Sequence, residues 1–361
     1  MIIVDAHEDL AWNILTFGRD YLQPVAQTRA RELGGEAALH NGQTLIGWPE
    51  WIQGNVAVVF ATLFVSPTNH RMGEWDRACY ENAEEAHRLY RAQLDVYHRL
   101  VAEHPDKLQL LTTRGELASL LAGWESGPPE QRRVGLVILM EGADGVREPD
   151  EIEQWFEWGV RLVGPAWVGT RYAGGTGAPG PLTAEGHALL RRMAELGMVL
   201  DLSHLAEEAT QNALAEYQGT IIASHSNPRG LAPESPRADR YLSDETIRHL
   251  AQRDGVIGVV PFNYFIKESW RPEQGRAGVT LADVVRHIDY ICQLTGSAAH
   301  VGIGTDFDGG FGLDKVPLEF NSVADLPRLG DALAAHGYDS AQIEGILGGN
   351  WLRMLYRSLP E

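Results

Sequence analysis

The strongest constraint on the fold is a repeated alternation of short apolar segments with longer amphipathic ones. The apolar segments are rich in Val, Ile and Leu and are almost continuously hydrophobic, which is typical of strands buried on both faces of a parallel sheet. Eight strands are predicted, at Ile2–Val4, Val56–Phe64, Gly135–Met140, Val160–Gly164, Met198–Leu202, Thr220–Ala223, Val256–Val260 and Val301–Gly304.

Amphipathic helices are expected between these strands. They are predicted at Asp76–His104, Asp150–Trp158, Thr183–Leu196, Ala206–Glu216, Ser243–Arg253 and Thr280–Leu294. Eight strands that alternate with helices favour a closed (β/α)8 TIM barrel over an open doubly wound sheet. We expect one barrel domain over 1–361, with an insertion at about Arg19–Gly54 that lies over the barrel mouth. The Gly- and Pro-rich segment Gly169–Pro181 is predicted to be a long loop that could act as a lid.

Composition excludes several classes of partner. The net charge of −19 argues against nucleic acid or an anionic membrane as a partner. No apolar run reaches membrane-spanning length, and the N-terminus lacks the basic and apolar regions of a signal peptide. The only cysteines, Cys79 and Cys292, have no metal-type spacing and suggest no disulfide framework. We therefore expect a cytoplasmic protein.

Histidine or carboxylate side chains follow five of the eight predicted strands. They are His7 and Asp9 after the first strand, Glu141 after the third, His204 after the fifth, His225 after the sixth and Asp306 after the eighth. The carboxyl ends of the strands of an α/β barrel converge on one face, where active sites lie. Residues far apart in the sequence are thus predicted to form one site.

The residue types indicate the chemistry of this site. Histidine and carboxylate ligands without cysteine suit Zn²⁺, or Mn²⁺, Fe²⁺ or Co²⁺ in its place. His7 and Asp9 are two residues apart on an extended segment, so they can share a metal. His204 and His225 come from adjacent strands and could hold a second ion, and Glu141 could bridge the two.

Catalysis by such a centre needs a nucleophile and a proton carrier. Water that bridges two cations has a lowered pKa and supplies hydroxide near neutral pH, and Asp306 would be the general base and acid. Each residue alone also has a structural explanation: His204 could be a satisfied core histidine, and Asp306 and Asp308 could form an Asx turn. These explanations would have to hold at five strand ends together, so we favour the metal centre.

Six motifs, in order along nearly the whole chain, resemble those of the membrane (renal) dipeptidase family, peptidase family M19. The motifs are Asp5-Ala6-His7-Glu8-Asp9-Leu10, Glu141-Gly142, Asp201-Leu202-Ser203-His204, Ser224-His225-Ser226-Asn227, Arg240-Tyr241-Leu242-Ser243-Asp244 and Gly304-Thr305-Asp306-Phe307-Asp308-Gly309. The resemblance implies an amidohydrolase-type barrel with two zinc ions, and hydrolysis of dipeptides, often with tolerance for a D-residue at the C-terminal position. It also makes a homodimer an expectation.

The resemblance implies a role for each matching position. It assigns one zinc to His7 and Asp9, the bridge to Glu141, the other zinc to His204 and His225, the substrate's C-terminal carboxylate to Arg240, and proton transfer to Asp306. The bidentate fork of an arginine suits a carboxylate.

One position departs from the family pattern. Typical members carry a Thr-His after the fourth strand that contacts the substrate carbonyl and its developing oxyanion, and Trp167 falls at the place of that histidine. Loss of one oxyanion donor costs about 10²–10³ in rate. Another donor could substitute, with Arg171 and Tyr172 nearest in sequence, or the substrate could differ from a plain dipeptide. The alternatives to a zinc dipeptidase are thus an amidohydrolase for another amide, lactone or modified peptide, and a metal-binding protein without hydrolysis.

Overall fold

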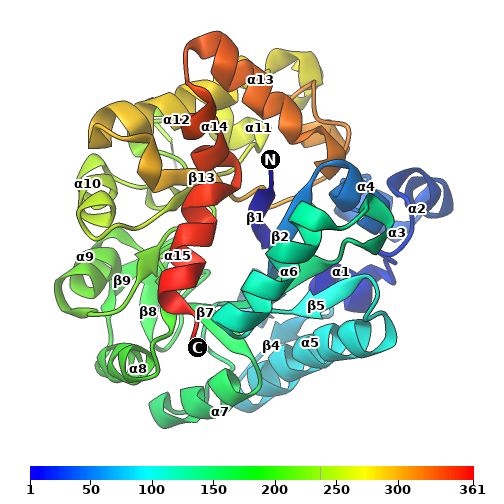
Figure 1. Ribbon diagram of the computed structural model, residues 1–361. Helices are drawn as coiled ribbons and strands as arrows, with labels where there is room; N and C mark the ends of the chain where they lie inside the picture. The colour runs from blue at the N-terminus through cyan, green and yellow to red at the C-terminus, as the bar shows by residue number, and fades with distance from the viewer. Residues whose placement is uncertain (236) are drawn as a thin grey trace.

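A ring of eight parallel strands forms the centre of the computed structural model, which describes residues 1–235 and 237–361 (Figure 1). The strands are β1 (Ile3–Glu8), β2 (Val56–Phe64), β6 (Val134–Glu141), β7 (Val160–Gly164), β10 (Val199–Asp201), β11 (Ile221–Ile222), β12 (Ile257–Val259) and β13 (Val301–Ile303). Their order is β11-β10-β7-β6-β2-β1-β13-β12, and a bridge between Ala223 and Ile257 joins the two ends. A short strand, β5 (Leu108–Leu110), pairs with β6 outside the ring. The predicted (β/α)8 barrel is confirmed, with a strand at each predicted place.

Helices surround the ring (Figure 1). Those predicted from the sequence are α5 (Ala83–Glu103), α7 (Ile152–Glu157), α8 (Ala184–Glu195), α9 (Glu207–Glu216), α10 (Asp244–Gln252) and α12 (Leu281–Thr295), and the others include α1 (Leu10–Phe17), α6 (Arg114–Ser126), α11 (Asn263–Ile266), α13 (Pro327–His336) and α14 (Ser340–Glu344). Helix α5 begins seven residues later than predicted, because β4 (Cys79–Tyr80) pairs with β3 (Ser66–Pro67) and Asn82 caps the helix. No helix in the described ranges is both long and apolar enough to cross a membrane.

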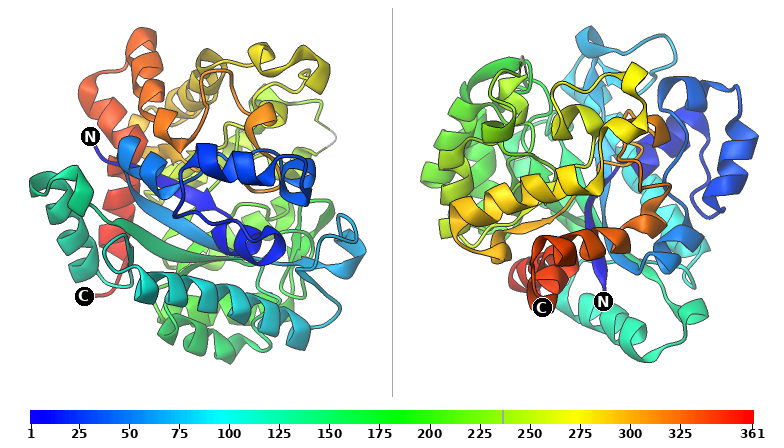
Figure 2. Two further views of the ribbon diagram at one scale, coloured as in Figure 1. Left: turned by 90° about the vertical axis from the view of Figure 1, so that its right-hand side faces the viewer. Right: turned by 90° about the horizontal axis from the view of Figure 1, so that it is seen from above.

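The amino end of the barrel is sealed by the last helix, α15 (Asn350–Ser358), which passes across it (Figure 1). Trp351 is buried there and donates from its indole nitrogen to the carbonyl of Ile303 at 3.0 Å. Asn350 donates to the carbonyl of Val301 at 2.7 Å. Both chain termini lie toward this end (Figure 2). The amino end is therefore packed and closed, which leaves the carboxyl end for a site.

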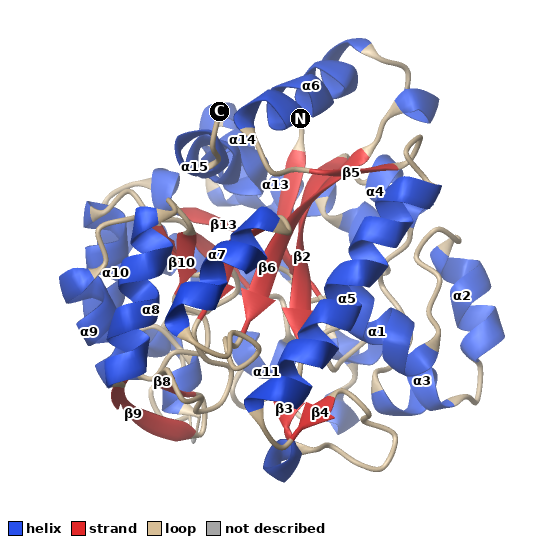
Figure 3. Ribbon diagram, turned by 90° about the horizontal axis from the view of Figure 1, so that it is seen from below, coloured by secondary structure: helices blue, strands red, loops and turns tan. Residues whose placement is uncertain are grey.

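Two small sheets lie at the carboxyl end of the barrel, one beyond β2 and the other beside α8 and α9 (Figure 3). One is the β3–β4 pair, and the other is an antiparallel hairpin of β8 (Ala173–Gly175) and β9 (Ala178–Leu182). The prediction of a long loop over Gly169–Pro181 is therefore wrong for most of that segment. A Cβ on Gly174 would lie 2.4 Å from the backbone nitrogen of Gly180, so glycine here permits close packing of two strands.

The insertion Arg19–Gly54 contains α2 (Val25–Glu32), α3 (Glu36–His40) and α4 (Trp48–Gln53). Its first two helices lie at the side of the barrel, beyond α1, rather than over the mouth (Figure 3). The reason is a long-range anchor: Arg19, Tyr21 and Thr44 all contact the carboxylate of Asp308, which follows β13. The expected position over the mouth is thus wrong.

Candidate metal centre

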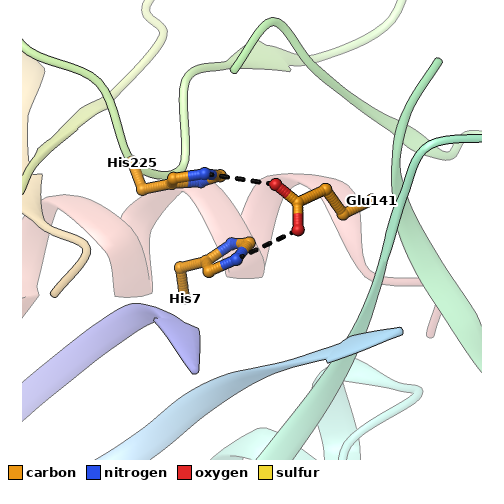
Figure 4. A group of neighbouring side chains, drawn as sticks. All are labelled: His7, Glu141 and His225. Carbon is orange, nitrogen blue, oxygen red and sulfur yellow. Dashed lines mark ion pairs between the residues drawn. The ribbon is translucent and has the colours of Figure 1, made fainter. Parts of the chain in front are cut away.

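The five predicted ligands meet at the carboxyl ends of the strands. His7 lies in β1 because that strand continues to Glu8, Glu141 is the last residue of β6, and His225 follows β11. The carboxylate of Glu141 lies between the rings of His7 and His225 (Figure 4). Its Oε2 is 3.5 Å from Nε2 of His7, and its Oε1 is 3.4 Å from Nε2 of His225 and 3.1 Å from Nε2 of His204. Asp9 completes the group, with Oδ2 3.8 Å from Nε2 of His7.

The spacing of these atoms fits metal ions. Ligand atoms bound to a tetrahedral zinc at about 2.1 Å lie roughly 3.4 Å from one another, close to the separations seen here. Two sets, His7 with Glu141 and His225, and His7 with Asp9 and Asp306, each place their ligand atoms within 4.8 Å of one another. In the described part of the chain, both ring nitrogens of His7 and Oδ1 of Asp9 are buried without a hydrogen-bond partner. Such orphaned polar atoms are rare unless a ligand satisfies them.

The second ring nitrogen of each of the other two histidines is held by a hydroxyl group. Nδ1 of His225 is 2.7 Å from Oγ of Ser224, and Nδ1 of His204 is 3.1 Å from Oγ1 of Thr176 in the turn of the β8–β9 hairpin. Hydrogen bonds of this kind fix the ring and leave Nε2 for a metal. Both Nε2 atoms point toward Glu141 and lie 3.0 Å apart. The hairpin thus helps to build the site.

Backbone strain is concentrated in the same motifs. Three residues other than glycine have left-handed backbones here, His204 (φ 67°), Asp306 (φ 56°) and Asp308 (φ 62°). Residues other than glycine with positive φ are uncommon, and such strain persists where surrounding structure enforces it, often at functional sites. The strain therefore marks the carboxyl end as a functional surface.

The charges of the cluster favour a cation. Burial alone would lower the pKa of His7, but the carboxylates of Glu141 and Asp9 outweigh it and raise that pKa well above its ordinary value. Burial alone would raise the pKa of Glu141, but the charge of His7 and hydrogen bonds from His204 and His225 hold it well below its usual range. Burial lowers the pKa of His204 to about 4, so this histidine is neutral, as a metal ligand must be.

Asp306 lies at the edge of the cluster. Its Oδ1 is 3.9 Å from Nε2 of His7, and its side chain is 14% exposed. Burial raises the pKa of this carboxyl well above its usual range, although His7 opposes the change. The position gives Asp306 access both to the ligands and to the pocket in front of them.

That pocket is a cavity of about 610 Å³, open at the carboxyl end. Asp9, Glu141, His204 and Asp306 form its polar floor, and Arg240 lines it as well. The guanidinium of Arg240 donates to the carbonyl of His225 at 2.8 Å and to Oγ of Ser226 at 3.2 Å.

The predicted substrate contacts divide into two groups. Trp167 lines the pocket with its ring 6.2 Å from the ring of His204. Arg171 and Tyr172 do not line it: both side chains donate to the carbonyl of Val146, and Tyr172 is fully buried. The suggestion that one of them replaces the missing oxyanion donor is therefore wrong, because the start of the hairpin directs both away from the site.

Sequence reasoning missed much of the pocket wall. Further lining residues are Trp12, Phe64, His70, Met72, Val168, Thr176, Gly177, Arg237, Asp239, Phe262, Phe265, Gly309, Gly310 and Phe311. His70 lies 6.4 Å from Trp167, ring to ring. Its position depends on the β3–β4 excursion, for which the sequence carries no periodic signal.

Comparison with known proteins agrees with this picture. The family model of membrane dipeptidase (peptidase family M19) matches residues 1–358. An uncharacterized protein in the pqqA 5′ region of Klebsiella pneumoniae is 32% identical over 73% of this chain and 93% of its own length. Dipeptidase aclJ of Aspergillus oryzae is 26% identical over 98% of this chain and 77% of its own length. A metallo peptidase from Rhodobacter sphaeroides, solved with a phosphinate mimic of the dipeptide L-Ala-D-Ala, shares the fold with a TM-score of 0.79, 23% identity and 99% coverage of each chain.

Proposed function

The chain belongs to the membrane dipeptidase family, peptidase family M19, and is a metallo-dipeptidase; from that premise we propose that it hydrolyses dipeptides with two zinc ions. The observation that carries the proposal is the buried cluster of converging nitrogen and oxygen atoms, in which both ring nitrogens of His7 and Oδ1 of Asp9 have no hydrogen-bond partner within the described structure. His7 and Asp9 would hold one ion, and His204 and His225 the other. Glu141 turns one carboxylate oxygen toward each pair.

The bound ions would lower the pKa of water and supply a bridging hydroxide near neutral pH. Arg240 would bind the C-terminal carboxylate of the substrate, since its guanidinium is held in place at the pocket wall. This contact would orient the scissile carbonyl toward the polar floor. Asp306 would accept the proton of the attacking water on its carboxylate and pass it to the leaving amine of the substrate. Its position in the lining of the pocket allows this transfer.

A D-residue at the C-terminal position is part of the proposal. Its support is the family resemblance and the L-Ala-D-Ala mimic bound by the Rhodobacter sphaeroides protein. Trp167 favours a second candidate, hydrolysis of another amide or modified peptide, because an indole ring occupies the wall where the family pattern has a histidine. The choice between them depends on which substrates fit against this ring.

The test compares metal-free and zinc-loaded enzyme on panels of L-Xaa-L-Xaa and L-Xaa-D-Xaa dipeptides. We expect no hydrolysis after chelation, recovery with zinc, and two zinc ions per chain by elemental analysis. Glu141→Gln should stay folded by circular dichroism but bind less zinc and lose activity. Full zinc occupancy without hydrolysis of any dipeptide would rule the dipeptidase out, and hydrolysis of other amides in that case would favour the second candidate.

Location and assembly belong to the same proposal. Cys79 and Cys292 are unpaired, which fits a reducing compartment, and we propose that the enzyme is cytoplasmic. The homodimer rests on family resemblance alone. Light scattering of the purified protein would test it.

A further inference from the structure

A second cavity adjoins the pocket of the metal centre. It has a volume of about 1080 Å³ and lies between α11, the start of α12 and the segment before Arg240. Arg237, Phe262 and Phe265 line both cavities. The two cavities therefore meet at these three side chains.

The lining of this cavity is basic. Its basic residues are Arg237, Lys267, Arg271, Arg286 and Lys315, against the two acidic residues Glu234 and Glu268. The whole chain has a net charge of −19 and only three lysines, of which two lie here. A local excess of positive charge in an acidic protein attracts anions. We call this volume the basic cavity.

Carboxylates of the protein do not neutralise most of these cations. Lys267 donates to the carbonyl of Gly278 at 3.1 Å, and Arg271 donates to the carbonyls of Glu268 and Trp270. Among the five, and within the described residues, only Arg286 has a carboxylate within 4.0 Å, that of Asp283 at 3.9 Å.

Many basic residues elsewhere on the surface are paired with carboxylates. Arg192, for example, contacts the carboxylates of Asp150, Glu153 and Glu195. Carbonyl groups satisfy hydrogen-bond donors but cancel no charge, so the basic cavity keeps a net charge for a ligand.

We propose, on the basis of the proposed dipeptidase function, that the basic cavity binds an acidic side chain on the C-terminal residue of the substrate. Arg240 is the expected partner of the α-carboxylate, and its guanidinium carbon lies 5.1 Å from the ring centre of Phe265. The side chain of a residue held at Arg240 thus starts beside the wall that the two cavities share. A carboxylate at its end would meet the excess of lysine and arginine side chains beyond that wall.

The test compares two nearly isosteric substrates, Ala-Glu and Ala-Gln, with the zinc-loaded enzyme. The wild type should show a kcat/KM about tenfold higher for Ala-Glu, and the double variant Lys267→Met/Lys315→Met should lose this preference while its kcat/KM for Ala-Gln stays within about twofold. A matched control, Lys107→Met/Arg191→Met, removes the same net charge from outside the cavity and should keep the preference.

Equal rates for the two substrates in the wild type, or a preference that survives in Lys267→Met/Lys315→Met, would overturn the proposal. Calorimetric binding of both dipeptides to zinc-loaded Asp306→Asn separates it from the proposed function. Tighter binding of Ala-Glu that depends on Lys267 and Lys315 would support the basic cavity even if no dipeptide is hydrolysed. Equal binding of the two would count against it.

Discussion

Two buried clusters of charge lie side by side at the carboxyl end of the barrel, and they use their carboxylates differently. One is the metal-binding cluster of His7, Asp9, Glu141, His204 and His225, with Asp306 at its edge. The other is the Asp308 cluster, in which Asp308 contacts Arg19, Tyr21, Thr44 and Leu45. The same short motif after β13 supplies Asp306 and Asp308, both in the left-handed conformation.

The difference lies in how the oxygen atoms are satisfied. Asp308 accepts from the hydroxyl of Tyr21 at 3.0 Å, the hydroxyl of Thr44 at 2.5 Å and the amide of Leu45 at 2.9 Å, and it pairs with Arg19 at 3.0 Å. Asp306 has one basic partner within 4.0 Å among the described residues, His7. A buried carboxylate whose oxygens are satisfied by protein donors, such as Asp308, stabilises the fold. A carboxylate with few protein donors, such as Asp306, can interact with a ligand.

The largest expected effect separates the two aspartates by their chemistry. Asp306→Asn keeps the shape but cannot carry the proton, so kcat should fall about 10²–10⁴-fold with zinc content and stability unchanged. Steady-state kinetics and elemental analysis check this. A loss of zinc in the variant would instead identify Asp306 as a ligand, a role that its distance to His7 also allows.

The corresponding change in the other cluster should act on stability. Asp308→Asn tolerates the left-handed backbone but removes one of the two carboxylates that pair with the buried guanidinium of Arg19 and leaves only that of Glu32, which should cost roughly 1.5–3 kcal/mol in the free energy of unfolding. Urea denaturation measures this, and the folded fraction should keep its zinc. Asp254→Asn is the matched control: Asp254 is also left-handed and paired with arginines, but its side chain is 49% exposed, so the cost should stay below about 1 kcal/mol. Equal costs at the two positions would contradict the contrast.

The contrast between satisfied and unsatisfied buried polar groups also applies to His287, a buried histidine outside the metal-binding cluster. Both of its ring nitrogens face partners in the protein. Nε2 of His287 lies 2.9 Å from the carbonyl of Ile266, and Nδ1 faces the amide nitrogen of Asn227 at 3.3 Å. The Asn227 amide is oriented by Val260, which donates to its Oδ1 and accepts from its Nδ2. A proton on Nδ1 would place two donors face to face. Burial lowers the pKa of His287 to about 4.

Stability should therefore fall in acid. The unfolded chain takes up this proton as pH falls through about 6.5, whereas the folded protein resists it until about pH 4, so the unfolded state binds more protons in between. The expected loss from His287 is roughly 2 kcal/mol between pH 7 and pH 5. His287→Gln should lose less stability than the wild type over this range in urea denaturation. His336→Gln, at an exposed position, should leave the wild-type pH dependence unchanged.

The sequence predicted the parts of the site that depend on local pattern. Apolar runs identified the strands, and the residue types just after them identified His7, Glu141 and His225 as neighbours, because strand ends of a barrel meet. It could not predict the structure or position of some of the segments that connect the strands outside the barrel. The glycines of 169–181 fit a loop as well as a hairpin, and only pairing between β8 and β9 distinguishes them.

Long-range contacts explain the other errors. The insertion 19–54 lies at the side of the barrel because its partners are almost 300 residues away at Asp308. Arg171 and Tyr172 are close to Trp167 in sequence, but they turn toward Val146. Nearness along the chain was the only argument for these two residues, and it says nothing about the direction of a side chain.

The smallest expected effect tests how Asp201, which contacts Ser224 and not the metal ligands, orients the ligand His225 through that serine. Asp201 accepts from the amides of Ser203 and Ser224 and, at 2.5 Å, from the hydroxyl of Ser224, which in turn contacts Nδ1 of His225. Because the Ser224 hydroxyl donates its proton to Asp201, it accepts a hydrogen bond from Nδ1 of His225. The ring proton of His225 then lies on Nδ1, and Nε2 carries no proton and can bind a metal.

Asp201→Asn would turn an NH2 group toward Ser224, so that the hydroxyl accepts from Asn and donates to Nδ1. This relay in reverse would place the ring proton of His225 on Nε2, where it blocks metal binding. Zinc affinity, measured by chelator competition, should fall about tenfold, with activity restored at saturating zinc. Asp144→Asn, a carboxylate that also accepts from one hydroxyl and one amide but contacts none of the five ligands, should leave zinc affinity unchanged, and equal losses in both variants would contradict the relay.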